Sequence, residues 1–366
     1  MAHFLFIRKN KDMMGCLYSK SKSSSFKRKV NENNKNAKGY SWDNKEAVNP
    51  KDFMIENAKD ETIVRLPGSV KGQQFIIQNC ENSNIYIYDH INTITVDDCN
   101  GCNVFIGPTK GSVFLRDCSE CRFLIVCQQF RARDCKVMDI FLCCATQPII
   151  ESCSDIRFGC FCYNYGPLED QFKNACLSIF NNNWSNIHDF TPAEGERNWS
   201  LLPKDARIED FFPLPSSEKL GDLQVLTDPQ SSLVPLTQGD LQRLSMHYCL
   251  VVFFADGHAQ NRALQLIKEL EQTESVLLRS KEVLLEEDAC ERIFGTNAYN
   301  KVIKRGPVIG LEYNGNHCIQ LCLETAKNIT TSTGCTGLIY VSTCPKNARN
   351  QIDKFFSHAD MQLSSQ

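Results

Sequence analysis

A short block of alternating apolar and polar residues recurs five times between residues 75 and 153, and each copy ends in a cysteine. These cysteines are spaced 19, 19, 17 and 18 residues apart: Cys80, Cys99, Cys118, Cys135 and Cys153. Counting back from each cysteine, the third and fifth positions are mostly apolar and the second is always polar. Alternation with a period of two predicts a strand with one buried face. A fixed repeat of this length predicts stacked coils, as in a parallel β-helix, with Asn or Asp beside the cysteines at the turns.

One copy of the repeat differs from the others at an outward position. The fourth residue before the cysteine is, in order, Ile76, Thr95, Phe114, Arg131 and Ile149. Only the copy with Arg131 carries a charge at this position. Stacking also places Arg116 on one side of Arg133 and Glu151 on the other, and like charges this close repel. Two interpretations stay open: a solvated face with a salt-bridge ladder through Glu151, or a guanidinium presented to an anionic partner.

After the repeats the pattern changes to a mixture of strands and helices. The segment 181–190 predicts either a last coil or a loop that packs back on the coils. Beyond it, apolar runs predict strands near 249–255, 275–285 and 307–313, and helical spacing predicts helices over 259–274, 288–294 and 317–329. This order is typical of a small ferredoxin-like α/β domain with an antiparallel sheet. We therefore divide the chain into a tail (1–39), a β-helix (40–212), a linker (213–245) and an α/β domain (246–366).

Composition narrows the class of protein. The chain has 366 residues and a net charge of −3, which excludes nucleic-acid binding by bulk electrostatics. It shows no secretory signal and no run of eighteen apolar residues. Thirteen of its 20 cysteines lie between Cys80 and Cys176. We expect a cytosolic protein whose thiols are reduced.

Two cysteine pairs have the spacing of a zinc ribbon, C-x-x-C twice with 15 residues between. The pairs are Cys99 with Cys102 and Cys118 with Cys121. Other copies of the repeat carry Ser83, Met138 or Ile156 at the second position, which a zinc site does not explain. Small apolar cysteines stacked inside the coils explain every copy, so we expect no metal.

The N-terminal tail contains a candidate lipid anchor. Residues 1–39 are polar and lack hydrophobic periodicity, which predicts disorder. The run 14–19 matches M-G-x-x-x-S, with Gly15 as the myristoylation site and Cys16 as the palmitoylation site. Basic residues follow between Lys20 and Lys29, and a second acyl chain or a basic patch makes an anchor stable. The signal acts only where Gly15 becomes N-terminal, through a start at Met14 or through processing. A chance match is the alternative.

Several stretches resemble the tubulin-cofactor-C family. They are MGCLYSK at 14–20, YSWD at 40–43, KDETIVRLPGSVKGQQFIIQNCENSNIYIYDH at 59–90, QQFRARDC at 128–135, FLCCATQPIIES at 141–152 and SIFNNNWSNIHDFTP at 178–192. The resemblance implies a right-handed parallel β-helix. It also implies that a smaller, nucleoside-diphosphate-kinase-like α/β domain of the ferredoxin-like type follows.

The resemblance also implies a function. It implies a GTPase-activating protein, an enzyme activator rather than an enzyme, for an Arf-like small GTPase in its GTP state. GTP and Mg²⁺ belong to that partner, and the chain has no cofactor of its own. Membrane attachment would be to the inner leaflet, on the cytoplasmic face of the plasma membrane and at the cilium and basal body, in ciliary protein trafficking. The residues implied are Arg131 as arginine finger, Glu151 to position Arg131, and Gln128, Gln129, Arg133 and Phe190 as partner-binding residues.

The α/β domain departs from an active kinase. Phosphotransfer requires a nucleophilic histidine in an N-x-x-H-G-S run, which is missing, and His317 lies at a different point. We expect no kinase activity and an interaction or scaffolding role. The four histidines of this region are expected to be surface or structural residues: His247, His258, His317 and His358.

Two other functions compete with GTPase activation. A non-catalytic effector or scaffold would bind the GTP form of the GTPase and use Arg131 only as an interface charge. A polysaccharide-active β-helix enzyme would need paired carboxylates or Ca²⁺ sites in a surface groove, and such enzymes are usually secreted. The carboxylates available, Asp97, Asp98 and Asp117, belong to predicted turns, and the expected compartment argues against that enzyme class.

Overall fold

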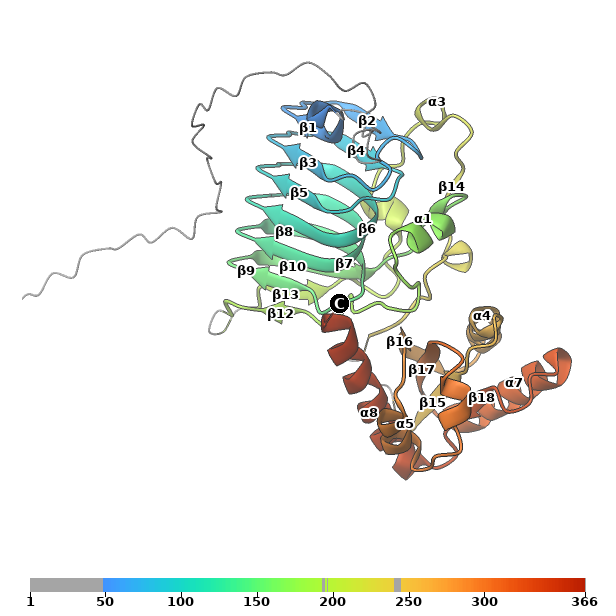
Figure 1. Ribbon diagram of the computed structural model, residues 1–366. Coiled ribbons are helices and arrows are strands. Elements are labelled where there is room, and N and C mark those ends of the chain that lie inside the picture. Colours follow the sequence, from blue (N-terminus) through green and yellow to red (C-terminus); the bar gives the residue numbers. More distant parts are fainter. Residues whose placement is uncertain (1–48, 193–194, 196, 240–244, 366) are drawn as a thin grey trace, which may run out of the picture. The chain divides into compact units, whose positions relative to one another are not determined.

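The computed structural model describes residues 49–192, 195, 197–239 and 245–365 (Figure 1). The tail lies outside the described residues, and with it the predicted lipidation sites Gly15 and Cys16. The described residues form a β-helix and a C-terminal α/β domain.

Two columns of parallel strands form the β-helix, whose stacked coils are visible in Figure 1. The first column consists of β1 (Met54–Glu56), β3 (Phe75–Gln78), β5 (Ile94–Asp97), the second halves of β6 (Asn103–Arg116) and β7 (Arg122–Arg133), β9 (Ile149–Glu151) and β12 (His188–Asp189). The second consists of β2 (Thr62–Arg65), β4 (Asn84–Ile87), the first halves of β6 and β7, β8 (Lys136–Cys144), β10 (Ser154–Cys160) and β13 (Trp199–Leu201). The predicted parallel β-helix is confirmed. The segment 181–190 supplies a last coil through β12.

The repeat cysteines lie inside the coils, next to a corner of the backbone. All five are buried, and each Sγ donates to the carbonyl two residues earlier, as Cys118 does to Arg116 at 3.1 Å. The residue before each cysteine has φ between +50° and +55°: Asn79, Asp98, Asp117, Asp134 and Ser152. Asn and Asp tolerate this left-handed conformation, so the corner explains the residue before four of the five cysteines, while Ser152 precedes the fifth. Among the described residues, no group of three or more His, Cys, Asp or Glu side chains could hold a metal ion.

A second left-handed corner contains a residue that fits it poorly. The corner positions are Asp60, Asn82, Gly101, Glu120, Val137 and Asp155, with φ between +48° and +64°. Val137 is β-branched, which disfavours this region of φ, and its side chain is 54% exposed, so packing does not compensate.

We expect Val137→Asn to raise the free energy of unfolding by about 1 kcal/mol, because asparagine adopts the left-handed conformation at lower cost. Urea unfolding measures the change. Val137→Thr is the control, since threonine is polar but keeps the β-branch. An equal gain from both variants would show that the effect comes from the removal of exposed apolar surface.

The outer face of the second strand column is covered by the chain that follows. The covering elements are β11 (Asn164–Tyr165), α1 (Leu168–Asn174), α2 (Ile208–Phe211), α3 (Ser217–Leu220), β14 (Val225–Leu226) and η2 (Pro229–Ser231), while η1 (Pro50–Phe53) precedes β1. The hydroxyl of Tyr86 donates to the carbonyl of Pro213 at 2.7 Å, and β14 pairs with β11. The described part of the predicted linker therefore packs on the β-helix, anchored by buried side chains such as Leu220 and Val234.

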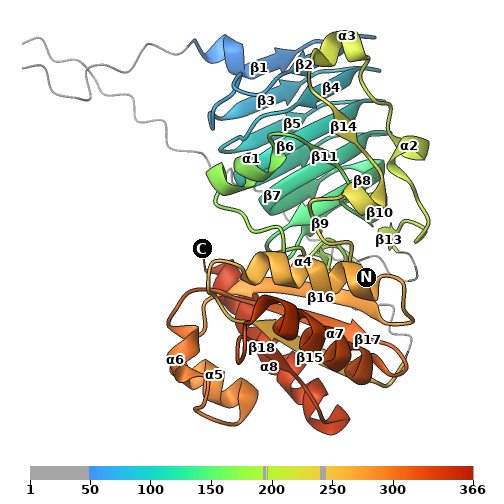
Figure 2. The ribbon, with the colours of Figure 1, turned by 90° about the vertical axis from the view of Figure 1, so that its right-hand side faces the viewer.

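The C-terminal region folds as the predicted ferredoxin-like domain (Figure 2). Its elements are β15 (Tyr248–Phe253), α4 (Ala259–Leu270), β16 (Val276–Val283), α5 (Glu287–Phe294), α6 (Asn300–Ile303), β17 (Val308–Asn314), α7 (Cys318–Thr333), β18 (Ile339–Val341) and α8 (Pro345–Ser364). The sheet is antiparallel, in the order β16-β17-β15-β18. Helices α4 and α7 cover one face, and α5 and α8 cover the other. Among the described helices, none is long and apolar enough to cross a membrane.

Backbone groups on the outer edge of strand β16 form hydrogen bonds to residues that precede the C-terminal domain. The side-chain amide of Asn181 binds Glu282 as a peptide group would, with Oδ1 accepting from the backbone N–H at 2.8 Å and Nδ2 donating to the carbonyl at 3.1 Å. The N–H groups of residues 238 and 239 donate to the carbonyls of Leu277 and Leu278. The next two asparagines bind the β-helix instead, as when Asn183 Nδ2 donates to the Ala145 carbonyl at 2.8 Å. The segment 181–183 thus joins β16 to the β-helix.

Candidate functional site

Arg131 stands in an ordered array of outward side chains on the first strand column. In-register pairing places Phe114, Arg131, Ile149 and His188 on successive coils. Two residues further along each strand stand Arg116, Arg133 and Glu151, and Phe190 continues this second row, since its N–H donates to the Ile150 carbonyl at 3.0 Å. We call this surface the arginine face, defined by Phe114, Arg116, Gln129, Arg131, Arg133, Ile149, Glu151, His188 and Phe190.

The three arginines of this face differ in their partners. Arg116 binds Asp97 with 2.7 Å between Nη2 and Oδ2, and Arg133 binds Asp134 with 3.2 Å between Nε and Oδ2. Arg131 is exposed and forms no ion pair or hydrogen bond through its side chain with any described residue. Its neighbours on the adjacent coils, Phe114 and Ile149, are apolar and half-buried. The positive charge of Arg131 is therefore left available to a partner.

Glu151 lies where stacking predicts, opposite Arg133 and diagonal to Arg131. Its carboxylate forms no ion pair with either arginine, so the predicted salt-bridge ladder does not run through Glu151; the ion pair between coils that does form in this row joins Arg116 to Asp97. Arg133 pairs with its neighbour in sequence instead: Asp134 occupies the left-handed corner directly after Arg133 and forms an ion pair with its guanidinium. A positioning role for Glu151 stays a prediction.

The two predicted glutamines face different surroundings. Gln129 lies in register with Ser112, and its Oε1 accepts a hydrogen bond from the Ser112 hydroxyl at 3.1 Å, so it belongs to the arginine face. The Nε2 of Gln128 donates to the carbonyl of Leu363 in α8 at 3.5 Å. This long-range contact had no signal in the sequence, because the prediction of helices ended before α8.

Phe190 is presented to solvent at the end of the last coil. Its side chain is 59% exposed, and its ring meets the ring of His188 edge to face, with 4.5 Å between centroids. The next turn is fixed by Asp189, whose Oδ1 accepts from the Thr191 N–H at 2.9 Å. His188 was not predicted as a site residue. Counting the strand alternation back from Phe190 would have placed both on the same face.

The C-terminal histidines gather into no comparable site. His247, His258 and His317 are exposed, and a ring nitrogen of His358 lies 3.1 Å from the Leu284 carbonyl. They lie on separate elements or loops, and no acidic residue forms an ion pair with them in the described chain.

Comparison with known proteins places the chain in a family. The family model for Tubulin binding cofactor C matches residues 72–190, which include the arginine face. Protein XRP2 of Homo sapiens is 49% identical over 352 residues, covering 96% of this chain and 99% of that protein. Protein XRP2 of Xenopus laevis is 48% identical over 355 residues, with the same two coverages. Tubulin Binding Cofactor C from Leishmania major, a solved structure, covers 32% of this chain and 81% of its own, with 24% identity and a TM-score of 0.28.

At this identity over nearly the full length of both chains, the described β-helix with its arginine face is a tubulin binding cofactor C domain, and the chain belongs to the Protein XRP2 family.

Proposed function

We propose that the protein is a GTPase-activating protein for an Arf-like small GTPase in its GTP state, and that Arg131 is its arginine finger. The observation that carries the proposal is the exposed guanidinium of Arg131, which has no partner in the described chain while its two neighbouring arginines are neutralised by Asp97 and Asp134. The family resemblance, carried by residues 128–135, gives the same role to this residue.

The geometry suits catalysis in trans. In the proposed complex, Arg131 enters the nucleotide site of the partner and stabilises the negative charge that develops on the transferring phosphoryl group. The partner supplies GTP, Mg²⁺ and the attacking water. Because β7 is hydrogen-bonded to strands on both sides, the Cα of Arg131 is fixed before the partner binds, which lowers the entropy lost in reaching the transition state. Phe190, exposed at the same face, is proposed as an aromatic anchor.

Single-turnover hydrolysis tests the proposal. A purified Arf-like GTPase is loaded with GTP and mixed with the full chain over a range of concentrations. Strong acceleration that saturates with concentration supports GTPase activation. Binding to the GTP form without acceleration would overturn it in favour of a non-catalytic effector or scaffold.

We expect Glu151→Ala to weaken activation without unfolding the protein. The Glu151 carboxylate is exposed and unpaired in the described chain, so its removal costs little stability. The substitution removes the negative charge next to Arg131 and Arg133, so the repulsion between the two arginines is no longer offset. The expected result is a drop of roughly tenfold in the apparent second-order rate constant of activated hydrolysis, with the melting temperature unchanged. Glu151→Gln separates charge from shape. A large fall in melting temperature would instead show a structural role.

In this proposal, the N-terminal tail attaches the protein to a membrane and the ferredoxin-like domain binds other proteins. Gly15 and Cys16 would carry myristoyl and palmitoyl groups, and the basic residues after them would bind the anionic inner leaflet. The protein would then act on the cytoplasmic face of the membrane, in ciliary protein trafficking. The ferredoxin-like domain would be an interaction module without kinase activity, because it lacks the N-x-x-H-G-S run.

A further inference from the structure

The side chains that flank Arg131 along its row form a distinct environment for a long cationic residue. Phe114 precedes it by one coil and Ile149 follows it by one coil, each in register with it. Neighbouring strands are roughly 4.8 Å apart, so side chains in one row lie within van der Waals reach of each other. Both flanking side chains are half-buried, whereas Arg131 is exposed. Arg131 thus leaves the surface between two apolar groups.

The two neighbouring arginines are restrained in another way. Arg116 and Arg133 are held at their charged ends by carboxylates. No carboxylate of the described chain binds Arg131 in this manner, so its guanidinium donors stay available to phosphate oxygens. Apolar flanks restrain the side chain differently, because they contact the methylene stem and leave the guanidinium free.

We propose that Phe114 and Ile149 are positioning residues that pack against the stem of Arg131 and hold its guanidinium extended from the arginine face. This inference rests on the proposed function of Arg131. It adds the reason why an unpaired arginine is pre-organised: the flanking side chains restrict rotation about its stem before the partner binds. An arginine side chain that is free before binding loses much rotamer freedom when it becomes fixed. That entropy loss would raise the free energy of the transition state.

Single-turnover hydrolysis at saturating concentrations of the full chain tests this inference. Phe114→Ala and Ile149→Ala are each expected to lower the maximal activated rate about tenfold, while the dissociation constant for the GTP-bound GTPase changes less than about threefold. Phe114→Leu should restore most of the rate, because leucine also covers the stem. Ile76→Ala is the matched control: Ile76 is apolar, half-buried and in the same row, but Thr95 and Phe114 separate it from Arg131.

A double-mutant cycle makes the test specific. If Phe114 acts through Arg131, adding Phe114→Ala to Arg131→Ala should cause no further loss of rate. The inference is wrong if Phe114→Ala raises only the dissociation constant, which would make Phe114 a direct contact of the partner. It is also wrong if the two losses are additive, or if Ile76→Ala has the same effect. If Arg131→Ala itself leaves the rate unchanged, the proposed function fails instead.

Discussion

Arg131→Ala is expected to remove nearly all activation of GTP hydrolysis, lowering the activated rate by roughly 10³- to 10⁵-fold, while the affinity for the GTP-bound partner changes only a few-fold. The loss is large because the guanidinium acts on charge that is greatest in the transition state. The affinity survives because the ground-state complex keeps the rest of the arginine face, including the exposed ring of Phe190.

Arg131→Lys is the more discriminating variant. Lysine keeps the charge and the long stem, but it replaces the planar fork of donors with a single ammonium group. If the fork is required to bind two phosphoryl oxygens, Arg131→Lys should resemble alanine in rate and wild type in affinity. The measurement is single-turnover hydrolysis with saturating protein, paired with a titration of the dissociation constant.

Arg133→Ala is the matched control, since Arg133 lies two residues away on the same strand but is bound to Asp134. Its effect on the maximal rate should be small. Hydrolysis that stays at the wild-type rate in Arg131→Ala would contradict the assignment. So would a loss of affinity as large as the loss of rate, which would make Arg131 an interface charge.

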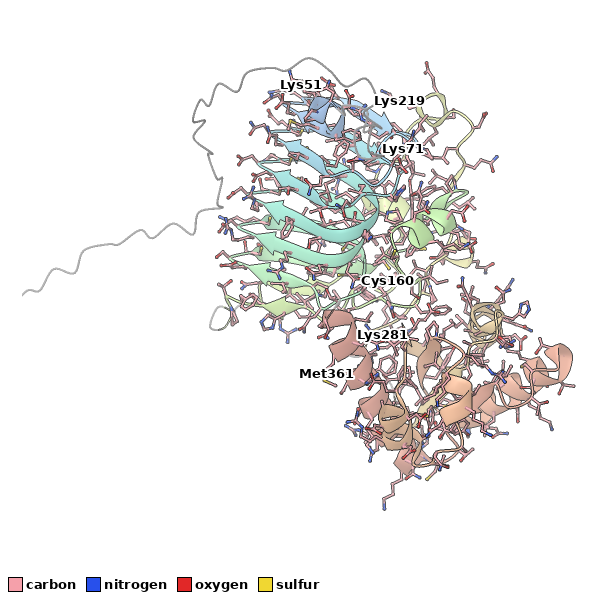
Figure 3. The ribbon with its side chains drawn as sticks, in the orientation of Figure 1. Lys51, Lys71, Cys160, Lys219, Lys281 and Met361 are labelled. Carbon is pink, nitrogen blue, oxygen red and sulfur yellow. The ribbon has the colours of Figure 1, made fainter. Side chains whose placement is uncertain are left out.

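The second large effect is expected at a buried lysine of the C-terminal domain. Lys281 on β16 is 1% exposed, and its Nζ lies 3.2 Å from Oδ1 of Asp360 on α8. Figure 3 labels Lys281, and also Met361, which follows Asp360 on α8. We expect Asp360→Asn to lower the free energy of unfolding by about 3 kcal/mol, because it leaves a buried ammonium without its counter-charge. Lys281→Met should be neutral or stabilising, since it removes the cost of desolvating the charge.

The same lysine predicts a dependence of stability on pH. Burial lowers the pKa of Lys281 below its ordinary value of 10.5, despite the attraction of Asp360. Between the lowered pKa and 10.5, the unfolded chain therefore binds more protons than the folded chain, and stability rises with pH in that window. Below the lowered pKa the full penalty is present.

Urea unfolding of wild type and Lys281→Met across the alkaline range measures this dependence. The stability difference between the two should narrow as the pH rises towards 10.5. At neutral pH, the stability difference between Asp360→Asn and Lys281→Met should be larger than the difference between wild type and Lys281→Met. A difference that is independent of pH would show that the charge of Lys281 is fully compensated in the folded protein.

The β-helix and the exposure of Arg131 could be predicted from the sequence because both follow from a local period. The alternation within each block fixes which side chains point outward, and the recurring cysteine fixes how blocks align. Stacking then places Arg116 and Glu151 on either side of Arg133, as the strand register confirms.

The features that could not be predicted depend on side-chain choices and on contacts distant in sequence. Alternation places Glu151 near the arginines but cannot show that Asp134, from its left-handed corner, binds Arg133 first. The contact between Gln128 and Leu363 joins residues 235 positions apart. The packing of the predicted linker rests on a few apolar side chains in a polar stretch, a pattern too sparse to give a period.

The asparagine at position 181 has a consequence for how the protein can be divided. The side-chain amide of Asn181 replaces a peptide group at the outer edge of β16. The β-helix thus satisfies hydrogen bonds of the C-terminal sheet without adding a strand to it. A C-terminal fragment cut free of residues 181–183 and 238–239 would carry an open strand edge, the feature through which sheets recruit other chains. We therefore expect the isolated C-terminal domain to self-associate more readily than the full chain, although the two folds are separate in topology.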